Sequence, residues 1–167
     1  MREPLDFLLA DHMRQRKICN ALDVLGLRPE QADSAEIVAV TFAYLSEDFP
    51  LHISDEEIDL YPSLRAVPDI DHGLEDLIDA ITRSHAIERS LVSDIIVLLK
   101  EAQQASGVAA TVSPNAKLLV SFTQCLRRNL VIEDQMLLPL ARKHLSDADL
   151  DRIGRAMAKR RNIDYPG

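Results

Sequence analysis

Apolar side chains recur along most of this chain at alternating spacings of three and four residues, the period of a helix with one buried face. The pattern, together with proline, glycine and capping residues, predicts five helices. They are expected over residues 4–25, 33–61, 71–104, 113–144 and 146–161. The joins between them are short, so consecutive helices should pack antiparallel. The sequence therefore predicts an all-α fold, an up-down-up-down antiparallel four-helix bundle with a short fifth C-terminal helix, as a single domain over residues 1–167.

Local signals set the expected helix ends. Gly26 should end the first helix and Pro62 the second, and Pro50 should kink the second helix internally. Capping boxes are expected where Asp33 precedes Glu36 and where Ser146 precedes Asp149. Ser113 followed by Pro114 is expected to begin the fourth helix.

Polar residues interrupt the apolar stripe of each of the four long helices. These residues are His12 in the first, His52 and Glu56 in the second, His85 and Glu88 in the third, and Asn129 and Glu133 in the fourth. An α-helix rises about 1.5 Å per residue. The three histidines, Asn129, Glu56 and Glu133 therefore lie roughly 8–22 Å from the end of the bundle that the four helices would share. We expect them to meet in one layer.

A bound cation would explain this layer. Burying histidines and carboxylates without a partner costs several kcal/mol for each uncompensated charge. Imidazole and carboxylate together suit iron, manganese or zinc. The spacing of four residues places His52 and Glu56 on one helix face, where both can bind the same ion. A purely structural polar network is the alternative.

Four segments resemble the hemerythrin-like (HHE cation-binding) family. They are residues 6–12 (DFLLADH), 49–62 (FPLHISDEEIDLYP), 84–85 (SH) and 129–141 (NLVIEDQMLLPLA). The resemblance implies a non-heme di-iron centre in the bundle core. It would place His12, His52 and Glu56 on one iron and His85 and Glu133 on the other, with both glutamates as bridges.

The chain departs from the family motif at one position. The motif expects a histidine four residues before Glu133, where this chain has Asn129, a weaker ligand for iron. We therefore expect the second metal position to be the weaker one. Glu88, three residues after His85, is the candidate substitute; it could also be an acceptor for a liganding histidine or an edge residue. Glu57 is expected to face solvent.

Net charge, apolar stretches and cysteine spacing exclude some classes of partner and location. The formal net charge of −8 argues against nucleic acid or an anionic membrane as partner. No apolar stretch approaches the length of a membrane helix, and the two cysteines show no CxxC spacing, so a cytoplasmic protein is expected. The basic run at residues 159–161 is expected to complement the negative end of the last helix.

These observations favour a protein that binds or senses O2, another diatomic ligand or iron, rather than an enzyme. Two alternatives stay open. One is a di-iron enzyme acting on O2, peroxide or Fe(II), and the other is an interaction module with a degraded metal site. The expected partners are the metal ion and a small ligand, and the sequence leaves a homodimer open.

Overall fold

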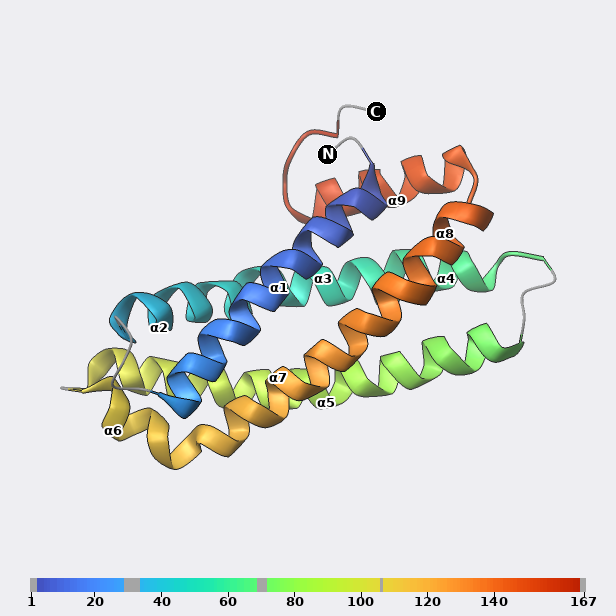
Figure 1. Ribbon diagram of the computed structural model, residues 1–167. Coiled ribbons are helices and arrows are strands. Elements are labelled where there is room, and N and C mark those ends of the chain that lie inside the picture. The colour runs from blue at the N-terminus through green and yellow to red at the C-terminus, as the bar shows by residue number, and fades with distance from the viewer. Residues whose placement is uncertain (1–2, 29–33, 69–71, 106, 166–167) are drawn as a thin grey trace.

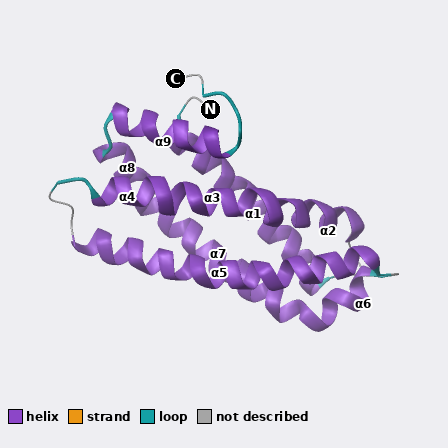
Figure 2. Cartoon of the chain, turned by 180° about the vertical axis from the view of Figure 1, so that it is seen from behind, coloured by secondary structure: helices purple, strands orange, loops and turns teal. Residues whose placement is uncertain are grey.

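The chain is almost entirely helical in the residues that the structure describes, which are 3–28, 34–68, 72–105 and 107–165. This computed structural model has no strand in those ranges (Figure 2). The α-helical segments are α1 (Pro4–Leu27), α2 (Ser34–Ala43), α3 (Phe49–Ser54), α4 (Tyr61–Arg65), α5 (His72–Gln104), α6 (Val108–Val112), α7 (Ala116–Ile132), α8 (Leu138–His144) and α9 (Asp147–Arg160). Because α2–α4 and α6–α8 each run on without a loop, the segments make up the five predicted helices.

The four long helices close into a bundle. α1 packs against α2 and α7, and α5 packs against the same two helices from the other side. Figure 1 shows these helices lying along the molecule, with α9 across one end, beside both chain termini. The predicted all-helical bundle with a short C-terminal helix is confirmed.

Some predicted helix ends are wrong. α1 continues through Gly26 to Leu27, because Gly26 is buried against α7 rather than free to form a left-handed cap. The fourth helix begins at Val108, ahead of Ser113, because Ser113–Asn115 forms a 3-10 turn inside the helix. The second helix passes Pro62 and ends at Arg65.

Other helix ends agree with prediction. Ser146 caps α9 in a capping box with Asp149, and α8 ends at His144. The predicted cap at Asp33 and the predicted helix start at residue 71 lie outside the described residues.

A π-helical turn lies before each of three prolines. The turns are Tyr44–Asp48, Asp55–Leu60 and Glu133–Leu137, and they come just before Pro50, Pro62 and Pro139. The backbone N–H groups of Phe49, Tyr61 and Leu138 donate to the carbonyls of Tyr44, Glu56 and Glu133, each five residues earlier. Proline has no N–H and its ring clashes with the carbonyl four residues before it. The extra residue in each turn relieves this clash, so the helices continue past their prolines.

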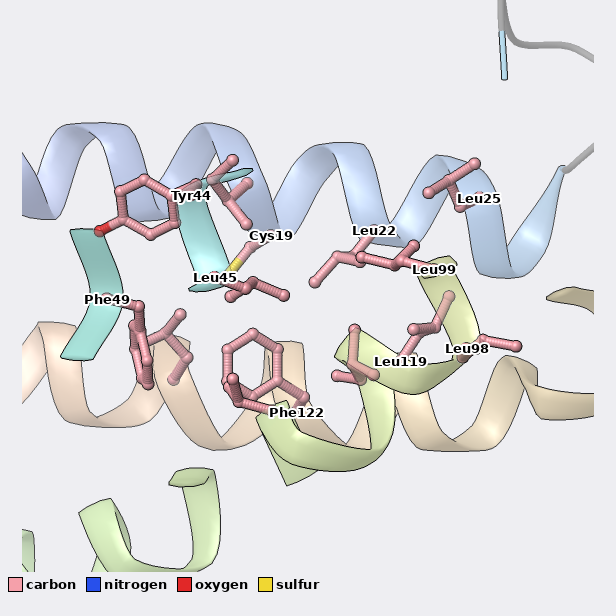
Figure 3. Packing of buried hydrophobic residues seen from close by; sticks show 14 of the residues in the cluster. Cys19, Leu22, Leu25, Tyr44, Leu45, Phe49, Leu98, Leu99, Leu119 and Phe122 are labelled. Atoms are coloured by element: carbon pink, nitrogen blue, oxygen red, sulfur yellow. The ribbon is translucent and has the colours of Figure 1, made fainter. Parts of the chain in front are cut away.

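Two apolar clusters fill the bundle, one on each side of a polar layer. The first contains Cys19, Leu45, Phe49, Phe122 and Leu126, with the Phe49 and Phe122 rings edge to face at 5.8 Å between centroids (Figure 3). The second contains Leu8, Leu60, Tyr61, Ile81 and Leu137 and extends to α9. Along every long helix, the predicted metal ligands fall between residues of the first cluster and residues of the second.

α9 closes the end of the bundle beside the second cluster. Arg161 donates to the Met157 carbonyl, as expected of a basic residue at a helix end. Arg160 and Arg161 also pair with two carboxylates of the second helix, Asp55 and Asp59, which the sequence alone did not indicate.

Two further observations concern the cysteines and the apolar character of the helices in the described ranges. Both Cys19 and Cys125 are free thiols. No helix there has both the length and the apolar character that crossing a membrane requires.

Candidate metal centre

All seven side chains expected at the centre are buried, with at most 3 % of their surface exposed. They are His12, His52, Glu56, His85, Glu88, Asn129 and Glu133. They come from α1, the α2–α4 helix, α5 and the α6–α8 helix. The four stripes therefore do bring their polar residues into one layer.

Glu56 lies at the middle of this layer. Its carboxylate oxygens are 3.6 Å from Nε2 of His12 and 3.5 Å from Nε2 of His52 and of His85. The Glu133 carboxylate adds contacts of 3.6 Å to His12 Nε2 and 3.4 Å to His85 Nε2. Three imidazoles and two carboxylates thus direct ligand atoms toward one small region.

These spacings are close to those of ligands around an ion. They exceed the roughly 2.7–3.2 Å of an N–H···O hydrogen bond, whereas two ligands about 2.1 Å from one ion lie roughly 3–3.5 Å apart. One ligand atom from each of His12, His52, Glu56 and Glu133 lies within 4.8 Å of the other three. This group could hold a metal ion.

Several atoms of the layer need a partner. His12 Nε2 and both carboxylate oxygens of Glu56 are buried and have no hydrogen-bond partner among the described residues. Leaving a buried polar atom unpaired costs about 1–3 kcal/mol, and more for a charged group. A cation would satisfy all three atoms together, so the donor set fits a metal.

A carboxylate lies behind each histidine. Nδ1 of His12 is 2.6 Å from Asp134, Nδ1 of His52 is 2.9 Å from Asp11, and Nδ1 of His85 is 3.1 Å from Glu57. Hydrogen bonds from Nδ1 of His12 to Asp134 and from Nδ1 of His85 to Glu57 keep the proton on that nitrogen and direct Nε2 toward the layer. The His52–Asp11 contact lacks the geometry of a hydrogen bond, although Nε2 of His52 also faces Glu56.

An arginine lies behind each of these carboxylates. Arg16 pairs with Asp134, Arg14 with Asp11 and Arg89 with Glu57. All three arginines are more than one-third exposed, so they connect the buried layer to the surface. Each histidine ends a chain of three residues that runs from solvent to the centre.

Protons occupy the layer when no cation is bound. Burial lowers the pKa of His12, but Asp134, Glu56 and Glu133 outweigh it and raise that pKa to about 10. In the same way Glu133 and Glu56 outweigh burial and raise the pKa of His85 to about 9. Burial raises the pKa of Glu56, and the surrounding histidines reverse this and hold it low. Metal binding here must displace protons from histidine.

The contact pattern of the layer occurs twice. His12 on α1 contacts both glutamates and Asp134, the residue after Glu133. His85 on α5 contacts both glutamates and Glu57, the residue after Glu56. Each half of the bundle thus supplies an inner histidine to the layer and an outer carboxylate to the other half's histidine.

The two halves differ at one pair. In the first half His52 contacts Asp11, the residue before His12. In the second half the corresponding residues are Asn129 and Ser84, and Asn129 Nδ2 donates to Ser84 Oγ at 2.9 Å. The imidazole and the carboxylate behind it are both replaced.

Glu88 takes part in this second arrangement. Asn129 Nδ2 donates to Glu88 Oε1 at 2.9 Å, whereas Glu88 Oε2 is buried without a hydrogen-bond partner in the described residues. Burial raises the pKa of Glu88 to about 8, against the lowering effect of His85. Asn129 and Glu88 contact each other beside the centre. Neither Glu88 nor His85 belongs to the group of four ligand atoms within 4.8 Å.

Sequence reasoning missed the outer carboxylates. Glu57 was expected to face solvent, which is wrong: its side chain is only 23 % exposed and contacts His85. The π-helical turn that contains Glu56 and Glu57 changes the rotation between neighbouring side chains, so the α-helical period misplaces it. A usable signal exists, because Asp11, Glu57 and Asp134 each adjoin a predicted ligand in the sequence.

Tyr61 was also missed. It is almost fully buried, its ring stacks on that of His85 at 6.0 Å, and its hydroxyl donates to Glu133 Oε1 at 3.5 Å. Tyr61 therefore forms the wall between the layer and the second apolar cluster.

Comparison with known proteins agrees with this description. A protein of Haemophilus influenzae described as uncharacterized is 25 % identical over 166 residues, which covers 96 % of this chain and 91 % of the relative. The family model of the hemerythrin HHE cation binding domain matches residues 3–141, a range that includes the whole layer but not α9. The chain therefore belongs to the hemerythrin HHE cation-binding domain family.

Proposed function

We propose that this chain is a non-heme iron protein that binds or senses O2, another small diatomic ligand, or iron itself. The observation that carries the proposal is the orientation of the three histidines. Each has Nε2 within 3.6 Å of a glutamate oxygen and Nδ1 within 3.1 Å of an outer carboxylate. Imidazole and carboxylate in this mixture suit iron.

We assign the ligands in two sets. His12, His52 and Glu56 would hold one iron, and His85 and Glu133 would hold the other, with Glu56 and Glu133 shared. Glu88 or Asn129 would complete the second set. When bound, iron would supply Lewis-acid and one-electron chemistry toward a small molecule.

The two positions should be unequal. The first set has an imidazole at His52, and Asp11 holds that ring in place. The second set has an amide at the corresponding place, and its nitrogen is turned to Glu88 and Ser84. We propose that the first position binds iron more tightly.

Burial supports a small ligand. The proposed ligands have at most 3 % of their surface exposed, and the first apolar cluster lies directly beside them. A diatomic gas suits such surroundings, whereas a large organic substrate would require the bundle to open.

We also propose that the four long helices run up-down-up-down within one domain. A cytoplasmic location stays a prediction.

Experiments can distinguish the proposed function from two others. A di-iron enzyme would turn over peroxide or Fe(II), and an interaction module with a degraded site would hold no metal. The test is metal analysis of protein purified without chelators, followed by visible absorption of the iron-loaded protein with and without O2. Bound iron with a reversible spectral change supports the proposal, and absence of metal from the native protein overturns it.

His144→Ala is the matched control for ligand variants. His144 lies at the exposed end of α8, so its loss should leave the iron content unchanged. His12→Ala should lower it. Equal iron content in the two variants would contradict the assigned ligands.

A further inference from the structure

The C-terminal helix lies outside the part of the chain that the family model matches. The match ends at residue 141, whereas α9 spans Asp147–Arg160. α9 packs on α1 and on the π-helical turn Asp55–Leu60, the turn that contains Glu56. The helix therefore contacts the backbone that positions a proposed iron ligand.

Two arginines make this contact. Arg161 Nη1 and Nη2 donate to the two oxygens of Asp55 at 3.1 and 2.6 Å, a two-pronged ion pair. Arg160 donates to Asp55 with one nitrogen and to Asp59 Oδ2 at 2.6 Å with the other. The Arg161 guanidinium also lies 4.7 Å from the centre of the Phe7 ring of α1.

These arginine–aspartate pairs are largely buried, so the loss of one partner should strongly affect stability. The Asp55 side chain has no exposed surface, and those of Arg161 and Arg160 are only 12 % and 19 % exposed. Two arginines face two aspartates, so the charges balance. Removing one partner of a buried pair leaves an uncompensated charge, which is strongly destabilising. Asp55 therefore cannot leave its position while α9 is docked.

Asp55 directly precedes Glu56 in the same turn. A π-helical turn is an uncommon backbone conformation that needs support from its surroundings. Pro62 lacks the N–H of the ordinary helical hydrogen bond just after the turn, and Arg160 and Arg161 hold the turn near its two ends, at Asp55 and Asp59.

We propose that Arg160 and Arg161 are positioning residues for Glu56, so that docking of α9 sets the metal affinity of the centre. The inference rests on the proposed function, because it takes Glu56 as a metal ligand. It assigns to α9, which the family match leaves out, a role in the site.

The test uses Co(II) as the probe. Co(II) binds N/O sites more tightly than Fe(II), and its visible absorption reports its ligands. Affinity is measured on the full chain by competition with a chelator, for the wild-type protein, Arg161→Gln, Arg160→Gln and the control Arg155→Gln. Arg155 lies on the same helix, but its ion pair with Asp151 is exposed.

We expect Arg161→Gln to lower Co(II) affinity by about tenfold or more, as loss of support behind a ligand usually does, and to change the Co(II) spectrum. Arg160→Gln should have a smaller effect and Arg155→Gln none. Far-UV circular dichroism checks that each variant is folded. If Arg161→Gln does not fold, Co(II) affinity is measured on the double variant Asp55→Asn/Arg161→Gln instead. That variant leaves no unpaired buried charge.

The outcomes separate the two proposals. A folded Arg161→Gln or double variant with wild-type affinity and spectrum overturns the role of α9 and leaves the proposed function intact. A wild-type protein that binds no Co(II) overturns the proposed function, and the role of α9 with it.

Discussion

Asn129 Nδ2 donates a hydrogen bond to Glu88 Oε1 at 2.9 Å, across the interface between α7 and α5. The amide thus presents its donor to a carboxylate at the position where the other half of the bundle has the imidazole of His52. A group that donates a hydrogen bond cannot at the same atom bind a cation. This relationship distinguishes the two halves of the centre.

Asn129→His together with Ser84→Asp should raise metal occupancy at the weaker position. The pair rebuilds the His52–Asp11 arrangement in the second half, with a carboxylate to hold the new ring. Metal equivalents per chain, measured after iron loading, should rise above those of the native protein. Asn129→His alone should give a smaller gain, because Ser84 is a weaker acceptor than Asp.

The control is Asn115→His, at an exposed position. Two equivalents of tightly bound metal in the native protein, unchanged in the double variant, would show that Asn129 does not weaken the site.

His52→Ala and Glu56→Ala should each remove bound metal without unfolding the bundle. Asp11 keeps Arg14 and Tyr44 as partners when His52 is lost, so no buried charge is left alone there. Metal analysis and far-UV circular dichroism of both variants are the measurements. Wild-type metal content in both would mean that the ligands lie elsewhere.

Asp134→Asn should lower metal affinity by roughly 10–100-fold, the usual effect of changing the group behind a liganding histidine. Asp134 is 2.6 Å from His12 Nδ1 and fixes the orientation of that ring. Asp151→Asn, on the surface of α9, is the matched control. Equal chelator-competition curves for the two variants would contradict a role for the outer carboxylates.

The metal-free protein should lose stability as the pH rises. The folded-state pKa values of His12 and His85 are raised from 6.5 to about 10 and about 9, so the folded protein retains protons that the unfolded chain releases. Their contribution is present in full below pH 6.5 and is lost as the pH rises toward 9 and 10. The expected loss is about 1 kcal/mol per pH unit for each histidine.

Urea unfolding of the metal-free protein between pH 7 and 9 measures this effect. His12→Gln should reduce the slope. The same protons must leave when a cation binds, so apparent metal affinity should rise over this range. A free energy of unfolding that does not change with pH would contradict the assigned pKa shifts.

The bundle and its inner layer were predictable because both depend on local spacing. A stripe with a period of 3.6 residues fixes which side chains point inward, and that rule placed His12, His85 and Glu133 correctly. Two features needed the folded structure. The π-helical turns change the rotation of Glu57, and the partners of the outer carboxylates come from other helices, so no spacing within one helix predicts them.

The same limit applies to the C-terminal basic run. Its position at a helix end is explained by the helix dipole, and the Arg161–Met157 hydrogen bond agrees with that. The pairing with Asp55 joins residues far apart in the sequence, and the burial of that aspartate cannot be read from its neighbours.

Pro62 and Pro139 each follow a proposed bridging glutamate by six residues, and each enforces the turn in which that glutamate lies. The prolines therefore favour the turns that carry Glu56 and Glu133 before any ion arrives, and Arg160 and Arg161 support the first of these turns. Such a centre is preorganised: little backbone entropy remains to be lost on binding, so uptake should be limited by how fast an ion enters and protons leave, and an emptied protein should accept metal again without refolding.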